Sequence, residues 1–407
     1  MTVWRAIRPL DVLYLRGNRL FGAAAGHSEA LMPPWPSVFA GAIRSRMLVD
    51  AGVDLGRFTD EDASPPAGLG GVLGTPAEPG TFRVAHVALL APGKDGEPGE
   101  PVFPLPADLV VVRESGKAAS GCGGDEKRSR DGLEVHRLVP SPWPDAIATS
   151  AAPQRALALR LSRPAKPETG WWLDLDGYET WLAGETPSTE QLVAVRDLWK
   201  TDLRLGIALD DASRTSATGQ LYTSDAVAMA RGAGFLVGIE GASDGDVPSD
   251  GLLRLGGDGR GAEITAWSGP VPGDPGVRPG EPFVLFLETP GLFPDGWVPP
   301  GVDPESLRLE ADGLTARLAA AAVPRAQVVS GWDVAAHRPK PAQRAVPAGA
   351  VYCFDRVSGD PAASVESLWR LIEARLGGGW DTVWKQRRAE GFNAVRLGRW
   401  PGEAGRD

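Results

Sequence analysis

The chain has 407 residues, 52 of them acidic and 42 basic, which gives a formal net charge of −10 at pH 7. Its 43% hydrophobic content and 14 tryptophans suffice for two buried cores, while 52 glycines and 37 prolines exclude a helical bundle and favour strands and loops. No apolar run approaches the roughly 20 residues that cross a bilayer, and the first residues lack a signal peptide's apolar segment. We therefore expect a cytoplasmic protein without membrane contact.

Cysteine and histidine usage argues against a metal centre. Cys122 and Cys353 lie far apart, and none of the four histidines has a second one at ligand spacing. We expect neither a bound metal ion nor a disulfide framework.

The chain opens with a predicted strand over residues 2–8, and the stretch over residues 32–46, MPPWPSVFAGAIRSR, predicts a proline-rich entry followed by a short helix. Prolines hold the entry extended, Ser37 is the expected helix cap, and apolar residues recur at helical spacing. Arg44 and Arg46 cannot both lie under the buried face, so at least one should reach solvent or a polyanion near the glycine-rich turn at residues 22–28. Ordinary solvated arginines are the alternative.

The middle of the chain predicts strands over residues 82–90, 155–161 and 171–175. Residues 115–131 have the composition of a disordered loop. A helix is expected from Ser188 to Trp199, because Gln191 stands three residues after the serine in the spacing of a capping box. The domain boundary is placed after this helix, which gives domains of residues 1–200 and 201–407.

The second half begins with a strand over residues 203–210 and then a glycine-rich hairpin loop, Gly256 to Gly261. Bare backbone at Gly256, Gly257 and Gly259 could approach an anion closely, and Arg260 would add charge. A plain tight turn is the alternative. The loop has neither the GK[ST] of a Walker loop nor the glycine spacing of a dinucleotide fold, so no cofactor is expected.

A proline-stiffened basic loop joins two predicted strands between residues 328 and 354. Trp332 offers a stacking surface, and His337, Arg338, Lys340 and Arg344 offer phosphate donors, a mixture that suits single-stranded RNA. A tryptophan at a strand end is also often a core residue.

The last predicted elements are a helix over residues 364–376, which buries Trp369 and Ile372, and a strand over residues 391–400. Residues 385–399 hold five basic side chains and one acidic one, and residues 1–46 hold six arginines and two acids. Basic patches at both ends of the chain favour RNA binding despite the negative net charge. The alternative is scattered surface charge that binds no partner.

Together these segments resemble a known family. The ordered set PLDVLYLRG, LMPPWPSVFAGAIRSR, LRLGGDGRGAEI, TPGLF, GWDVAAHRPKP, VPAGAVY and GFNAVRLGRW is similar to RAMP-superfamily subunit three of the type III-B CRISPR effector, the Cmr complex. The resemblance covers almost the whole chain except residues 115–131 and 300–312. It implies an α+β fold of two ferredoxin-like (RRM-type, βαββαβ) domains with long loop insertions.

The resemblance also implies a non-catalytic role. Such a subunit binds the 5′ repeat-derived tag of the CRISPR RNA (crRNA) and docks to the large polymerase-like subunit and the adjacent backbone RAMP subunit. The subunit would contact target RNA only indirectly, because base pairing with the guide recognises the target sequence. DNA-targeting effectors leave sequence recognition to their guide in the same way. The residues expected to contact RNA are His27, Arg44, Arg46, Gly256, Gly257, Gly259, Arg260, Trp332, His337, Arg338 and Lys340.

Two other functions stay open. A metal-independent repeat endoribonuclease would use His27 with nearby Tyr14 for acid–base chemistry, although no lysine lies in that segment. A scaffold that binds only protein would show no RNA affinity of its own. Two-metal chemistry is disfavoured, because the run Gly256–Gly259 lacks the second carboxylate of a GGDD turn.

Overall fold

A computed structural model describes residues 2–15, 27–28, 30–56, 58, 65, 68–75, 78–113, 130–143, 155–159, 161, 165–209, 213, 215–311, 313–333, 337–362, 369–372 and 382–401. It is a mixed α+β structure built mostly from strands with few helices, which confirms the predicted fold class at that level. No helix in these described ranges combines the length and the apolar character needed to cross a membrane.

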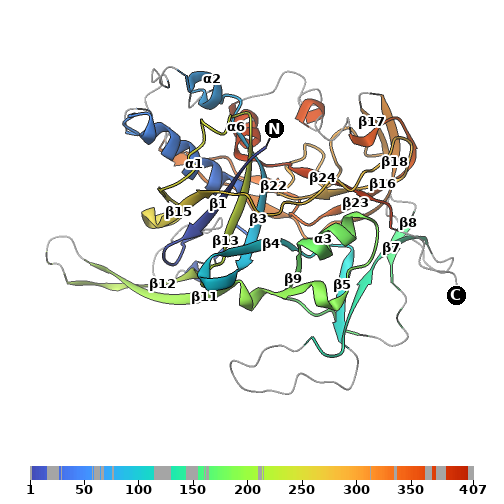
Figure 1. The fold of residues 1–407 in the computed structure, drawn as a ribbon, viewed down its shortest axis with the longest axis horizontal. Helices are drawn as coiled ribbons and strands as arrows, with labels where there is room; N and C mark the ends of the chain where they lie inside the picture. Colours follow the sequence, from blue (N-terminus) through green and yellow to red (C-terminus); the bar gives the residue numbers. More distant parts are fainter. Residues whose placement is uncertain are drawn as a thin grey trace.

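An antiparallel eight-stranded sheet is built from strands between residues 3 and 266 (Figure 1), in the order β10-β9-β4-β3-β13-β1-β15-β14. The predicted first strand is confirmed as β1, and it pairs on one side with β13 and on the other with β15. The strands are β1 Val3–Pro9, β3 Arg83–Pro92, β4 Pro98–Pro104, β9 Trp171–Asp174, β10 Leu192–Ala194, β13 Gly234–Glu240, β14 Leu252–Arg254 and β15 Gly261–Ala266.

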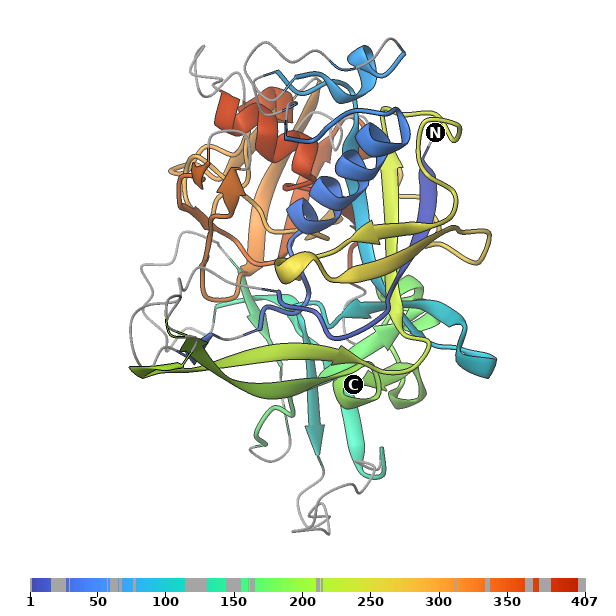
Figure 2. The ribbon, with the colours of Figure 1, turned by 90° about the vertical axis from the view of Figure 1, so that its left-hand side faces the viewer.

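Helix α1, Pro36–Asp50, covers one face of this sheet (Figure 2). Phe39, Ile43 and Met47 lie in the core beneath it, as the helical spacing predicts. The expected serine cap is wrong, because the helix begins at Pro36 with Trp35 as N-cap and no side chain caps it. Proline at the first helical position has no N–H that needs a partner, so the helix starts one residue before Ser37.

A second antiparallel sheet has five strands in the order β17-β18-β23-β16-β24. Helix α6, Thr382–Glu390, stands between β23 and β24 in the chain and contacts both α1 and β3. The strands are β16 Phe283–Leu287, β17 Arg308–Ala311, β18 Leu314–Ala322, β23 Val351–Ser358 and β24 Val395–Arg399.

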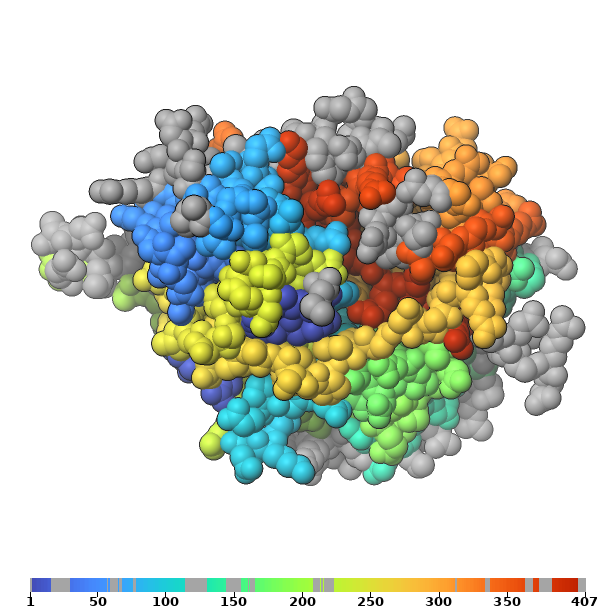
Figure 3. All heavy atoms as spheres, turned by 45° about the horizontal axis from the view of Figure 1, so that its top comes forward, coloured from blue at the N-terminus to red at the C-terminus, as the bar shows by residue number. Residues whose placement is uncertain are grey.

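The two sheets share a core. Ala6 and Leu236 from the first sheet lie in one cluster with Phe286 and Val351 from the second, and helix α3, Leu175–Leu182, adds Trp181. In Figure 3 the yellow and blue surface of the first sheet adjoins the red surface of the second near the centre of the view.

Smaller ladders surround the sheets. A long ribbon of β11 and β12 carries the short β2 on its far edge, and two small ladders lie between β18 and β23 in the chain. These strands are β2 His27–Ser28, β5 Leu109–Arg113, β6 Leu133–Arg137, β7 Val139–Pro142, β8 Arg155–Ala158, β11 Trp199–Leu209, β12 Ser216–Met229, β19 Gln327–Val329, β20 Trp332–Asp333, β21 Arg338–Pro339 and β22 Gln343–Ala345, with a short helix α2 at Gly70–Leu73.

The helix predicted from Ser188 to Trp199 is wrong. The capping box does form, since Ser188 N–H donates to Gln191 Oε1 at 2.9 Å, but it closes only a 3-10 turn at Thr189–Gln191. Pairing of β10 with β9 then takes the chain into the first sheet. A tertiary ladder has overridden a local helix signal.

The predicted domain boundary near residue 200 falls within the run of strands that builds the first sheet. Strands β13, β14 and β15 follow that residue in sequence and flank or extend the sheet around β1. All strands of the five-stranded sheet follow residue 282.

Two other predictions concern segments that are largely undescribed. Nearly all of the 115–131 loop lies outside the described residues. The helix predicted over residues 364–376 is described only at residues 369–372, where Trp369 and Ile372 are buried as expected.

Candidate functional site

The glycine turn, Gly256–Gly261, joins β14 to β15 as predicted. Gly256 has φ +75°, and a Cβ there would lie 2.9 Å from the carbonyl oxygen of Tyr14. The N–H of Gly257 donates to that same carbonyl at 2.8 Å. Glycine is needed here for a close approach between two segments of this chain.

Arg260 is held beside the turn by two neighbours. Its Nη1 lies 2.8 Å from Asp11 Oδ2, and its guanidinium carbon lies 5.1 Å from the centre of the Tyr14 ring. A carboxylate and an aromatic face together compensate the arginine charge. The turn thus brings together the predicted Gly256, Gly257, Arg260 and Tyr14, but with the cation already paired.

The two arginines of α1 also have internal partners. Arg44 Nη2 donates to the carbonyl oxygen of Leu73 at 2.9 Å, and burial lowers the pKa of Arg44. Arg46 Nε lies 2.6 Å from Asp50 Oδ1, and its Nη1 donates to the carbonyl oxygen of Leu252 at 2.5 Å. Both guanidiniums therefore connect α1 to its surroundings.

The basic loop forms a two-tier hairpin over residues 327–345, here called the 327–345 hairpin. Its inner tier pairs β19 with β22, and its outer tier pairs β20 with β21. Val329 and Ala345 of the inner tier are buried, so this tier is anchored in the body. The outer tier carries Trp332 away from the core.

Trp332 is 55% exposed, so the alternative in which it is a core residue is wrong. His337, Arg338 and Arg344 are exposed as well. Within the described part of the chain, the side chains of Arg338 and Arg344 have no hydrogen bond or ion pair. Among the described residues, the hairpin thus presents an exposed indole and two exposed arginines without an ion-pair partner.

Helix α6 fixes the neck of the 327–345 hairpin. The buried Arg387 donates to the carbonyl oxygens of Ser330 at 3.0 Å and Pro341 at 3.3 Å, and to Gln343 Oε1 at 2.9 Å. Glu390 compensates Arg387 at 3.0 Å and also pairs with Lys340. Lys340 is therefore held by Glu390 at the neck of the hairpin, next to the exposed outer tier.

His27 and Tyr14, the two residues that a nuclease would use, lie along the ribbon of β11 and β12. His27 and Ser28 form β2, parallel to β12 beside Thr223 and Ser224, but the His27 side chain lies outside the described residues. Tyr14 follows Leu13, which bridges to Val227 of β12. The backbones of the two segments share one edge of β12, and the Tyr14 ring is occupied by Arg260.

A buried polar cluster that the sequence analysis missed joins the two sheets. Glu288 Oε1 lies 2.6 Å from Arg396 Nε and accepts from the Tyr178 hydroxyl at 3.2 Å, and Oε2 lies 2.6 Å from His86 Nδ1. Although burial opposes it, Arg396 and His86 hold the pKa of Glu288 well below its usual range. The sequence signal is weak: His86 stands within the apolar run of β3, and Glu288 directly follows the apolar strand β16.

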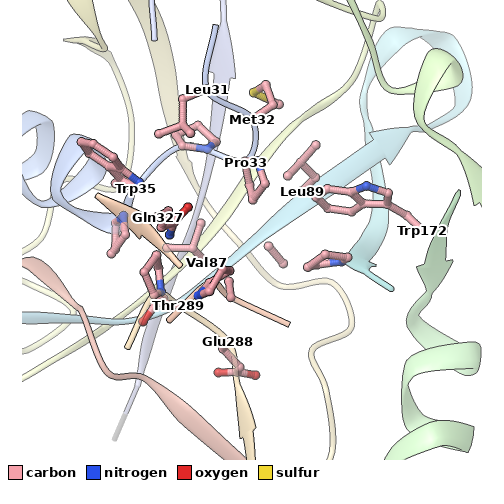
Figure 4. A pocket seen from close by; sticks show the side chains of 17 residues that line it. Leu31, Met32, Pro33, Trp35, Val87, Leu89, Trp172, Glu288, Thr289 and Gln327 are labelled. Atoms are coloured by element: carbon pink, nitrogen blue, oxygen red, sulfur yellow. The ribbon is translucent and has the colours of Figure 1, made fainter. Parts of the chain in front are cut away.

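A cavity of about 170 Å³ lies beside this cluster, between the entry to α1, strand β3 and the end of β16 (Figure 4). Its walls are mostly apolar, with Trp35, Val87, Leu89 and Trp172 labelled around it, and Glu288 and Gln327 at its border. None of the residues predicted to contact RNA lines it. In the described ranges, His, Cys, Asp and Glu form no group of three or more that could hold a metal ion.

Comparison with known proteins gives the following. One similar solved structure is a chain of the type III-B Cmr-beta bound to cognate target RNA and AMPPnP, in state 1, at 15% identity and a TM-score of 0.49, covering 93% of this chain and 94% of that one. A chain of Cmr-beta bound to cognate target RNA matches at the same identity and TM-score, covering 94% of both. A chain of a Csm3–Csm4 subcomplex from the type III-A CRISPR-Cas interference complex is 10% identical, with a TM-score of 0.34 and coverage of 88% and 94%.

No curated protein matches the sequence. The family model described as CRISPR-associated protein (Cas_Cmr3) matches residues 5–400. That match spans both sheets, the glycine turn and the 327–345 hairpin, and the chain belongs to this CRISPR-associated family.

Proposed function

We propose that the chain is subunit three of a type III-B CRISPR effector and binds the 5′ repeat-derived tag of the crRNA. Family membership supports a place in that complex. The observation that carries RNA binding is the exposed Trp332 on the 327–345 hairpin, with Arg338 and Arg344 unpaired in the described part of the chain. An indole face stacks on an unpaired base, and free guanidiniums displace counterions from phosphates.

The fold of each half supports this proposal. In the first sheet β1, β3, β13 and β15, numbered 1 to 4 along the chain, stand in the order 4-1-3-2 and are antiparallel. In the second, β16, β18, β23 and β24 have the same order. We infer two ferredoxin-like cores, the first retaining the helix after its first strand, α1, and the second the helix before its last strand, α6.

The remaining roles belong to the same proposal. The chain docks to the large polymerase-like subunit and to the adjacent backbone RAMP subunit, and meets target RNA only through the guide. A cytoplasmic, non-catalytic role is part of the same proposal, and the contact of the Arg260 guanidinium with the Tyr14 ring supports it by giving Tyr14 a partner within the chain.

Binding of a short single-stranded RNA with the repeat-derived tag sequence, followed by fluorescence anisotropy, tests the proposal. Trp332→Ala is expected to weaken binding by about 1–3 kcal/mol, or roughly 5- to 150-fold, because one stacked base is lost. Trp297→Ala is the matched control, since Trp297 is also an exposed tryptophan but lies outside residues 327–345. Equal affinities for the Trp332 variant and the unaltered chain would contradict the proposal.

Incubation of repeat RNA with the chain in the absence of metal ions tests whether the chain is instead an endoribonuclease. We expect the RNA to stay intact. Cleavage that stops in a His27→Ala variant would assign the endoribonuclease function instead.

A further inference from the structure

One carboxylate faces three cations between α1, α6 and the neck of the 327–345 hairpin, where the two helices contact each other. Glu390, the last residue of α6, pairs with Lys340 and, at 3.0 Å, with Arg387. Arg44 of α1 lies within electrostatic reach of the same carboxylate. These four side chains, here called the neck cluster, carry three positive charges and one negative charge, a net charge of +2.

The neck cluster is largely withdrawn from water. The side chains of Arg387, Glu390 and Lys340 are 1%, 8% and 19% exposed, and Arg44 is half-buried. Burial lowers the pKa of Arg44, and the charge of Glu390 opposes this shift without cancelling it. The C-terminus of α6 adds only about half a negative charge. Excess positive charge therefore remains, and it is costly away from water unless an anion compensates it.

Two of the three cations keep free hydrogen-bond donors. Each nitrogen of Arg387 already donates to the hairpin or to Glu390. Arg44 has five N–H groups, but only its Nη2 has a partner in the described part of the chain, the carbonyl oxygen of Leu73. Its other nitrogens are not sealed off from solvent. Lys340 has three N–H groups, and its ammonium has a single partner among the described residues, Glu390.

The neck cluster adjoins the exposed indole of the hairpin. Trp332 pairs with Pro339 across the outer tier, and Lys340 is the next residue, with its backbone N–H donating to the carbonyl oxygen of Gly331 at 2.9 Å. A nucleotide carries its phosphate one sugar away from its base. A strand with a base stacked on Trp332 therefore has a phosphate near Lys340.

We propose that Arg44 and Lys340 together bind one phosphodiester group of the RNA strand, in the space between α1 and the neck of the hairpin. A guanidinium and an ammonium with free donors suit phosphate oxygens, and one phosphodiester removes one of the two excess charges. Arg387 and Glu390 are positioning residues, which hold the hairpin and Lys340 in place. This inference rests on the proposed function, because the phosphate belongs to the strand that stacks on Trp332.

The first test separates binding from stability. Arg44→Met and Lys340→Met are each expected to weaken binding of tag RNA by about tenfold or more, because hydrogen bonds from a charged group to phosphate are lost. Without RNA, the unfolding temperature of Arg44→Met should stay the same or rise, because a buried excess cation has been replaced by an apolar side chain. Arg83→Met is the matched control, since Arg83 is a similarly half-buried arginine paired with Glu240, and its RNA affinity should not change. A lower unfolding temperature of Arg44→Met together with unaltered RNA affinity would assign Arg44 a structural role and overturn the inference.

The second test locates the phosphate on the RNA. Each phosphate of the tag RNA is replaced in turn by an uncharged methylphosphonate. One replacement, next to the base that stacks on Trp332, should weaken binding to the unaltered chain and have almost no further effect in Arg44→Met, because both changes remove the same contact. Replacements that weaken binding equally in the two chains at every position would contradict a shared contact.

Inorganic phosphate tests the neck cluster in the absence of RNA. At equal ionic strength it should raise the unfolding temperature of the unaltered chain more than chloride does, and the difference should disappear in Arg44→Met but persist in Arg83→Met. If phosphate acts in this way and tag RNA does not bind, the proposed RNA function fails and the anion site stands. If tag RNA binds equally well to the unaltered chain and to both neck variants, the anion site fails and the proposed function stands.

Discussion

The glycine turn and the 327–345 hairpin differ in how the chain treats their arginines. Arg260 is compensated by Asp11 and covered by Tyr14, whereas Arg338 and Arg344 have no such partner in the described part of the chain. In sequence both segments combine arginine with residues typical of loops. The difference teaches that pairing within the fold, and not residue type, decides which basic loop is available to a polyanion.

The largest effect should come from breaking the neck of the hairpin. Arg387→Ala removes a buried guanidinium that binds three groups of the hairpin and leaves Glu390 with less compensation. We expect the free energy of unfolding, measured with denaturant, to fall by about 3–5 kcal/mol. Lys385→Ala on the same helix removes only an exposed pair with Glu78 and should cost less than about 1 kcal/mol.

The next effect concerns the junction between the two sheets that carry these regions. Because the pKa of Glu288 is held well below its usual 4.5, its ion pairs stabilise the fold above that pH and are lost as the pH falls toward the lowered pKa. Glu288→Gln should cost about 2–3 kcal/mol at pH 7. The difference between variant and unaltered chain should shrink as the pH is lowered from about 5 to 3, and a constant difference would refute this account.

At the glycine turn a single methyl group should be costly. Gly256→Ala forces an L side chain into φ +75° and toward the carbonyl of Tyr14, so we expect a loss of about 1–3 kcal/mol in thermal unfolding experiments. Gly245→Ala is the control, because a Cβ there meets nothing within 4 Å. Its unfolding temperature should hardly change.

The smallest effects compare the two basic regions directly. Arg338→Ala should reduce the salt dependence of RNA affinity by about 0.7 in the slope of log K against log salt, the value for one phosphate contact to a single strand. Arg260→Ala should leave that slope unaltered, because Asp11 already compensates its charge. Equal slopes in the two variants would contradict the claim that the hairpin, and not the glycine turn, contacts RNA phosphates.

Much of the fold could be predicted from hydrophobic spacing. The strands near residues 2–8, 82–90 and 252–267 and the helix after Trp35 all form, because each has a consistent apolar period. The helix predicted from Ser188 to Trp199 does not form. The capping signal there is correct, but pairing of β10 with β9, a tertiary contact, takes the segment into the sheet.

For the predicted site residues, the sequence indicated exposure better than it indicated pairing. The combination of Trp332, Arg338 and Arg344 in one loop predicted a segment available to RNA, and all three side chains are exposed. Sequence cannot show that Arg44 meets the carbonyl of Leu73 or that Glu288 meets Arg396, since both contacts join segments distant in the chain. Burial and pairing are set by those long-range contacts.

The position of β1 in its sheet has a consequence for biosynthesis. Both of its neighbours, β13 and β15, come more than 220 residues later, ending at Glu240 and Ala266. Strand β1 therefore leaves the ribosome long before either neighbour and waits with both edges open until residue 266 has been made. A chaperone that shields nascent strands, or slow translation of the segment up to residue 266, would decide how much of the newly made protein escapes aggregation.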